Sequence, residues 1–255
     1  MRRLAAALPP LVLVAVLLGA WELACRLWQV PAYLLPAPSA IGVALIQNAP
    51  ALAVAAWRTL AMALQALFAD SLFASALALV VTLSRTLDQA VRPLAVALQV
   101  TPVVAIAPLF VIWAGVDHPG RAIVALAAIV AFFPIFSGAA RGLGGADPDL
   151  ERLFDLYGAS RLQRLMRLRL PSAVPFLVEG HKVAAGLAII GAVVAEFVAG
   201  SGGAQGLAWR ILEAGNRLQT AKMFAAIIAL ALMAAALHFI FQALERRALV
   251  WWRGR

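Results

Sequence analysis

The chain has 255 residues, of which 64% are hydrophobic and 13% charged, a balance typical of a polytopic membrane protein that argues against a soluble globular domain. Its net charge of +9 would suggest nucleic acid in a soluble protein, but basic residues of a membrane protein are first explained by membrane orientation, so we expect no nucleic-acid partner. Because Cys25 is the only cysteine, an internal disulfide and a metal site built from thiolates are excluded.

Long apolar runs determine the expected fold. A hydrocarbon core of ~30 Å is crossed by ~20 apolar residues in a helix. We predict six spans, near residues 8–28, 60–83, 93–114, 121–141, 173–199 and 222–244. The first run lacks a signal-peptide cleavage site, so we expect it to be retained. The sequence therefore predicts an all-α polytopic membrane protein, 1–255, with a single transmembrane domain.

Proline and glycine residues mark where the predicted transmembrane helices are interrupted or connected. Pro102 and Pro108 fall inside the third predicted span and should kink or break it. Between the first two spans, a proline-rich stretch leaves room for one short helix after Ser39. After the fifth span, Gly200–Gly203 predicts a turn, and residues 207–214 predict a short interfacial helix.

Arginine and lysine predict the orientation. With the N-terminus inside, the cytoplasmic segments hold most of the basic residues, including those of the loop after the fourth span. We therefore expect both termini in the cytoplasm. The same arrangement places residues 147–171 on the cytoplasmic side.

Residues 147–171 form the most polar segment of the chain. Asp147 followed by Pro148 is typical of a helix N-cap with proline in the first turn, and Asp149 and Glu151 add negative charge where the helix dipole favours it. Apolar residues at spacings of three and four then predict one stripe on a short amphipathic helix: Leu150, Leu153, Phe154 and Tyr157.

A glycine interrupts this helix, and a second helix follows at a new angle. Gly158 marks the corner, and Ser160 with Gln163 has the form of a capping box. We expect Pro171 to end the second helix. Its arginines could hold anionic headgroups or form a partner surface: Arg161, Arg164, Arg167 and Arg169.

Glu196 and Asp70 lie within apolar runs of predicted spans, where a charge is costly unless it lines water or is paired. Glu196 is a candidate for the translocation path or a gate, with binding of local backbone amides as the alternative. Asp70 is a second candidate, although Gln65, Ser71 and Ser75 could satisfy it within the bundle.

The fifth span carries two further patterns. Its small residues fall at steps that allow close helix contact in lipid: Ala184, Ala188 and Ala192, with Gly186 and Gly191 close by. Near its start, snorkelling or mutual pairing accounts for the polar side chains of Glu179, His181 and Lys182.

The glycine-rich stretches do not bind nucleotides. Neither Gly142–Gly145 nor Gly200–Gly203 is followed by the lysine and hydroxyl residue of a P-loop. We therefore expect no cofactor in this chain, and any ATP must be bound by another polypeptide.

The polar segment resembles the EAA-type loop of permease subunits of bacterial ABC importers. Gly158, Leu168, Leu170 and Pro171 match the spacing of that loop. Four other segments resemble the sulfonate, nitrate and taurine branch of these permeases: Gln99–Gly115, Ala131–Phe136, Tyr157–Gln163 and Gly186–Gly200. One departure is that Arg152, Leu153 and Phe154 stand at the Glu-Ala-Ala positions that name the loop, so the acidic residue is shifted to Glu151 or absent.

The resemblance implies a set of partners. It implies a permease of the bacterial inner membrane, present in two copies, with two ATP-binding ATPase subunits and an extracytoplasmic solute-binding protein. The residues then expected in the ATPase-docking loop are Glu151, Asp155, Tyr157, Gly158, Ala159, Ser160, Leu168, Leu170 and Pro171. The residues expected in the pathway or its gate are Glu196, Pro102, Asp70 and Gly191.

The sequence leaves alternatives for the transported solute and for the class of membrane protein. The resemblance implies a sulfonate, taurine, nitrate or related compound, yet relatives of this branch are associated with pyrimidine precursors of thiamine and with riboflavin-like vitamins. The spans contain no cluster of arginines that would argue for an anion site. An alternative of another class is a secondary transporter or a membrane scaffold that acts without an ATPase.

Overall fold

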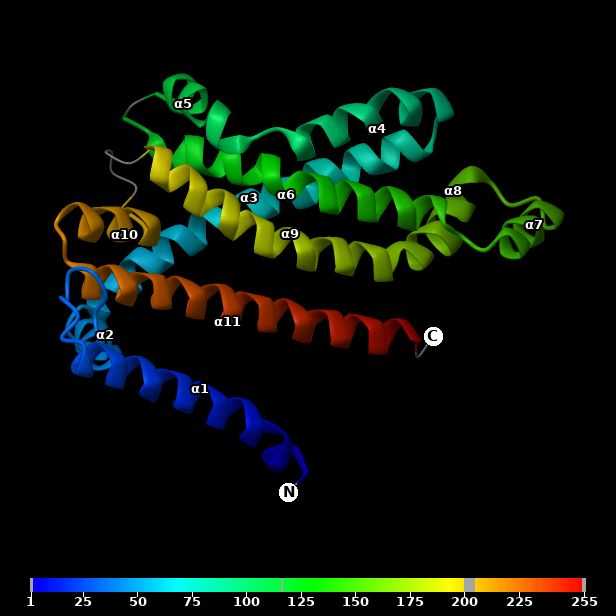
Figure 1. The fold of residues 1–255 in the computed structure, drawn as a ribbon. Helices are drawn as coiled ribbons and strands as arrows, with labels where there is room; N and C mark the ends of the chain where they lie inside the picture. The colour runs from blue at the N-terminus through cyan, green and yellow to red at the C-terminus, as the bar shows by residue number, and fades with distance from the viewer. Residues whose placement is uncertain (1, 116, 200–204, 254–255) are drawn as a thin grey trace. The chain divides into compact units, whose positions relative to one another are not determined.

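The computed structural model describes residues 2–115, 117–199 and 205–253, and all regular structure within these ranges is helical (Figure 1). The all-α prediction is confirmed. The predicted turn at Gly200–Gly203 lies outside the described residues. The elements are α1 (Arg2–Leu27), α2 (Pro38–Gln47), α3 (Ala49–Thr82), α4 (Arg85–Val100), α5 (Val103–Ala114), α6 (Pro119–Gly144), α7 (Pro148–Leu156), α8 (Arg161–Arg164), the π-helix η1 (Leu165–Arg169), α9 (Leu170–Ala199), α10 (Leu207–Asn216) and α11 (Thr220–Arg253).

Five helical stretches of the described chain are long and apolar enough to cross a membrane: Pro9–Leu27, Ala49–Thr82, Pro119–Gly144, Arg161–Ala199 and Thr220–Trp252. Taken as one broken span, α4 and α5 make a sixth, so the prediction of about six spans is confirmed. The short helices expected after Ser39 and at residues 207–214 are present as α2 and α10.

The third predicted span is not one helix. The two helices α4 and α5 are bent by 98° relative to each other, with Thr101 and Pro102 at the bend. Pro102 has no N–H to continue the helical ladder and disfavours helical geometry at Thr101, whose ψ is 125°. The expected break is therefore confirmed at Pro102, whereas Pro108 lies within α5 without ending it. α4 begins at Arg85, eight residues before the start of the predicted span at 93–114.

The chain packs as two compact units, Met1–Trp57 with Gln205–Ala231 and Arg58–Ala204 with Leu232–Arg255. In the first unit, the Ser39 hydroxyl and N–H donate to Glu22 at 2.8 and 2.9 Å, and the Thr220 hydroxyl donates to the Tyr33 carbonyl at 2.6 Å. These bonds tie α2 to α1, and α11 to the segment before α2. A single domain over 1–255 stays a prediction.

The second unit is built on α6 and α9, which run side by side, with α4 and α5 against α6 (Figure 1). Backbones approach closely where glycines face the partner helix. A Cβ at Gly180 would lie 2.6 Å from the Pro134 carbonyl oxygen, and one at Gly191 would lie 2.8 Å from the Ala127 Cα. The alanines of the predicted small-residue stripe, Ala184, Ala188 and Ala192, are buried on α9. The expected close helix contact is confirmed.

The polar residues near the start of the fifth span do not pair with one another. Lys182 Nζ lies 2.8 Å from Glu245 Oε2 on α11, and His181 Nδ1 lies 2.7 Å from the Leu177 carbonyl oxygen. Glu179 is exposed. Mutual pairing was a wrong expectation, because α11 brings a carboxylate from 63 positions away in the chain.

Candidate functional site

The polar segment begins with the predicted capped helix. Asp147 Oδ1 accepts a hydrogen bond of 2.8 Å from the Asp149 N–H, and Pro148 occupies the first turn of α7. Asp149 and Glu151 lie in that first turn, where carboxylates stabilise the positive end of the helix dipole. α7 therefore forms from signals within its own sequence.

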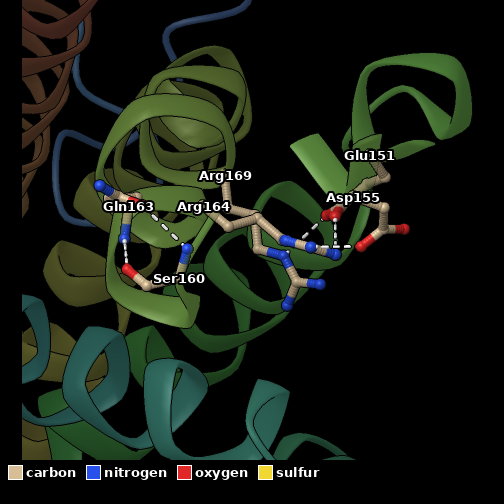
Figure 2. Close-up of polar contacts among 6 residues, drawn as sticks. All are labelled: Glu151, Asp155, Ser160, Gln163, Arg164 and Arg169. Atoms are coloured by element: carbon tan, nitrogen blue, oxygen red, sulfur yellow. Dashed lines mark hydrogen bonds and ion pairs between the residues drawn. The ribbon is translucent and has the colours of Figure 1, made fainter. Parts of the chain in front are cut away.

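A sharp corner follows at Gly158. Its φ of +62° is in the left-handed region, which glycine adopts without a steric penalty. No described atom comes within 4 Å of the position that a Cβ at Gly158 would take, so the corner is open to its surroundings. The next helix starts with the predicted capping box, in which Gln163 N–H donates to Ser160 Oγ at 3.3 Å and Ser160 N–H to Gln163 Oε1 at 2.8 Å (Figure 2).

Ion pairs connect the two arms of this corner (Figure 2). Glu151 on α7 accepts from Arg164 at 3.1 Å through one oxygen and from Arg169 at 2.9 Å through the other. Asp155 also pairs with Arg164. We call Glu151, Asp155, Arg164 and Arg169 the ionic latch. Because both oxygens of Glu151 are held within the chain, this residue braces the corner from inside.

The second arm does not end where the sequence predicts. Residues 161–199 are helical throughout, and Pro171 lies in the first turn of α9, so its predicted role as a helix end is wrong. The physical reason is η1, where hydrogen bonding shifts by one residue and Leu170 N–H donates to the Leu165 carbonyl. A π-turn widens the helix just before Pro171. The wider turn leaves space for the proline ring, and the helix continues although Pro171 has no N–H to donate.

The side chains of the loop divide into exposed and anchoring ones. Leu156 and Tyr157 beside the corner are 85% and 82% exposed, and α7 buries none of its residues among the described parts of the chain. In contrast, Leu168 is only 4% exposed, and the Pro171 carbonyl accepts a 2.7 Å hydrogen bond from the Trp252 indole N–H. The loop therefore presents an apolar tip on an anchored base.

Glu196 is buried on α9 with 2% of its surface exposed. Its Oε1 accepts a 2.7 Å hydrogen bond from the hydroxyl of Thr59 on α3, which is fully buried. A hydrogen bond between buried side chains of two helices fixes the relative positions of α3 and α9. Gly191, five residues earlier, packs against α6, so the structure places it in a helix contact.

Asp70 on α3 is 5% exposed, and the neighbours that the sequence suggested do not satisfy it. Its Oδ2 has no hydrogen-bond partner within the described ranges, and the Ser71 hydroxyl instead donates to the Leu67 carbonyl at 2.7 Å. Asp70 lines a cavity of about 420 Å³ between α3, α4 and α6. Pro102, the N-cap residue of α5, does not line this cavity.

The two arginines of the latch were named from the sequence, but their ion pairs with α7 were not predicted. Arg164 and Arg169 were expected to face headgroups or a partner, whereas they contact Glu151, 13 and 18 positions earlier. A signal was present in the charge pattern, since acidic α7 precedes an arginine-rich helix across one glycine corner. The loop is thus a self-braced element whose charges are largely satisfied internally.

These features define a polytopic membrane protein with one rigid, polar, helical loop. The sequence profile of the binding-protein-dependent transport system inner membrane component family matches residues 70–250. The chain belongs to this family: it is a multi-pass permease of a bacterial ABC importer, and such permeases are non-catalytic transmembrane components that act with an ATPase and a binding protein.

Curated relatives align over most of the chain. A probable ABC transporter permease protein of Haemophilus influenzae is 32% identical over 91% of this chain and 93% of its own length. The formylaminopyrimidine transport permease protein ThiX of Halalkalibacterium halodurans is 32% identical over 98% of both chains. The taurine transport system permease protein TauC of Escherichia coli is 30% identical over 93% of this chain and 87% of its own.

Proposed function

We propose that two copies of this chain form the translocation pathway of an importer whose ATPase subunits dock on the corner at Tyr157–Ser160. The observation that supports the proposal is the combination of a braced base with an open, apolar tip. A loop that transmits movement must be stiff, and the capping box and the ionic latch supply stiffness. A loop that binds a partner must offer surface, and Leu156, Tyr157 and Gly158 are exposed.

The mechanism follows from the continuity of the helix. ATP is bound by the partner subunits, and closure of the two ATPases displaces the corner. Because residues 161–199 form one helical stretch, displacement of the corner moves α9. Movement of α9 changes the surroundings of Glu196 and Thr59 and opens the pathway alternately to each side. Both termini then lie in the cytoplasm, on the side of the ATPases.

The solute is small and is delivered by an extracytoplasmic binding protein. Sulfonates, taurine and nitrate are one candidate group, and pyrimidine precursors or riboflavin-like vitamins are the other. Full-length alignment with permeases named for taurine and for formylaminopyrimidine supports both groups. Membership of the family argues against a secondary transporter or a scaffold without an ATPase.

The test is a pull-down from gently solubilised membranes that compares the native chain with Gly158→Arg. An arginine at the open corner should obstruct the docking surface, so the ATPase should co-purify with the native chain and be lost, at least tenfold, from the variant. Membrane insertion should be unchanged, because, apart from the two chain neighbours, no described atom lies within 4 Å of a Cβ at Gly158.

Two control variants separate bulk from backbone strain. Gly158→Ala imposes the same left-handed strain with little bulk and should retain most of the ATPase. Gly42→Arg on α2 adds the same side chain at another glycine with open space around it and should retain all of it. Recovery of the ATPase with Gly158→Arg at the native level would refute docking at this corner.

A further inference from the structure

The cavity beside Asp70 lies within the second unit, between α3, α4 and α6. Its volume of about 420 Å³ is in the range of small-molecule binding sites. Apart from Asp70, the described residues that line it are apolar: Phe73, Leu77, Val91, Leu94, Ala95, Leu98, Ala128, Ile129 and Phe132. The cavity is therefore an open apolar pocket with one buried carboxyl group.

That carboxyl group lacks the partners that burial demands. A buried acceptor left without a hydrogen bond destabilises the folded state, because it has lost its bonds to water and gained none in return. Asp70 Oδ2 is enclosed without a partner among the described residues, and rotation about the Cβ–Cγ bond exchanges the two oxygens at little cost. A molecule in the cavity that donates a hydrogen bond would remove this penalty.

The walls add a preference for flat rings. Phe73 and Phe132 line the cavity with ring centroids 6.0 Å apart, and Phe132 stacks on Phe136 at 5.6 Å. Aromatic rings pack favourably against further rings in offset or edge-on arrangements. A flat heteroaromatic ligand with an N–H donor on its edge satisfies both the walls and the carboxyl group.

We propose that this cavity binds an aminopyrimidine-like solute, a flat heteroaromatic molecule whose exocyclic N–H donates to Asp70. The proposal rests on the proposed function in one respect, that the molecule bound in the cavity is the transported solute. It selects the nitrogen heteroaromatic group over sulfonates, taurine and nitrate.

Other occupants fit the observations less well. A sulfonate or nitrate carries no N–H to donate to Asp70, and the apolar wall offers neither anion a hydrogen-bond donor. A hard metal cation requires six or more oxygen ligands, whereas Asp70 is the only acidic residue among the described residues of the lining. A lipid acyl chain would occupy the pocket and leave the carboxyl group without a partner.

Binding can be measured with matched ligands on the full-length chain, purified with its ATPase in lipid nanodiscs. The probes are 4-aminopyrimidine, 4-(dimethylamino)pyrimidine, which has the same ring without N–H donors, and ethanesulfonate. Ligand-detected NMR titrations give the three affinities. We expect 4-aminopyrimidine to bind about fivefold to a hundredfold more tightly than the dimethylated ring, the range expected when a buried acceptor loses its hydrogen bond.

Variants assign the site. Asp70→Leu should reduce the affinity for 4-aminopyrimidine to that of the dimethylated ring. Asp88→Asn on α4 is the matched control, because the Asp88 carboxylate pairs with Arg92 at 2.8 Å and does not line the cavity, and it should bind like the native chain. The comparison of ligands on the native chain needs no variant, so the test stands even if Asp70→Leu fails to fold.

Three outcomes would overturn the proposal. They are equal binding of the two pyrimidines, unchanged binding by Asp70→Leu, and binding of ethanesulfonate that depends on Asp70. Co-purification of the ATPase with Asp70→Leu checks the permease role separately. If Asp70→Leu retains the ATPase and the two pyrimidines bind equally, only the proposed class of solute is refuted. If the native chain does not co-purify with an ATPase, the proposed function is refuted.

Discussion

The α6–α9 pair and the corner at residues 147–171 are stabilised in opposite ways. Along α6 and α9, glycines and alanines let two backbones meet, and a methyl group added at Gly180 would contact a carbonyl oxygen at 2.6 Å. At the corner no residue of α7 is buried within the described structure, and caps and ion pairs determine the geometry.

The difference reflects two solvents. In lipid, removal of apolar surface from water no longer drives association, so close packing of small residues must do so. In water the same packing is not available to a nine-residue helix with one apolar stripe, and short helices are marginal without caps. Three substitutions test whether shape or polarity dominates in each region.

The largest effect is expected where shape alone acts. Gly180→Leu should displace α9 from α6, because the nearest atoms are backbone and cannot rotate away. We expect a loss of ~3 kcal/mol or more and little monodisperse protein, measured by size-exclusion chromatography and thermal unfolding in detergent. Gly186→Leu, on the same helix with no described atom within 4 Å, should behave like the native chain. Equal behaviour of the two variants would contradict the packing argument.

An intermediate effect is expected for a polar contact inside the helical core. Thr59→Val keeps the side-chain shape but removes the donor to Glu196, which should destabilise the fold by ~1–3 kcal/mol. Thermal unfolding measures the loss, and Thr59→Ser should restore most of it because the hydroxyl is retained. If valine and serine were equivalent, the hydrogen bond would not matter.

The smallest effect on stability is expected in the latch. Glu151→Gln removes the charge that faces Arg164 and Arg169, and ion pairs near the surface contribute about 1 kcal/mol or less. We expect faster hydrogen exchange in residues 148–164 with a nearly unchanged unfolding temperature. Arg152→Gln, which removes an exposed ion pair with Asp149 on the same helix, should leave exchange unchanged. Unaltered exchange in Glu151→Gln would show that the caps alone hold the corner.

Features encoded within a few residues were predictable from the sequence. The cap at Asp147, the capping box at Ser160 and the break at Pro102 each depend on neighbours within three or four positions. The pairing of Lys182 with Glu245 could not be predicted from the sequence, because Glu245 lies on another helix. The prediction that Pro171 ends the second helix was wrong because a π-turn accommodates the proline ring, and a π-turn has no clear signal in the sequence.

The residues of the candidate site also differ in whether local sequence or tertiary packing determines their surroundings. Local spacing indicated the corner at Gly158, and hydropathy indicated that Asp70 and Glu196 would be buried. The partner of Glu196 lies 137 positions away, and the cavity beside Asp70 needs three helices to exist. Their surroundings therefore emerge only from tertiary packing.

The unbroken run from Arg161 to Ala199 has a mechanical consequence. A helix rises ~1.5 Å per residue, so the 26 steps from Leu170 to Glu196 correspond to a rod of about 39 Å. A tilt of about 5° at one end of such a rod shifts the other end by about 3 Å, which is the length of one hydrogen bond. Under the proposed function, leverage of this kind would let a small rotation of the corner exchange the hydrogen-bond partners of the Glu196 carboxyl group at the far end of α9.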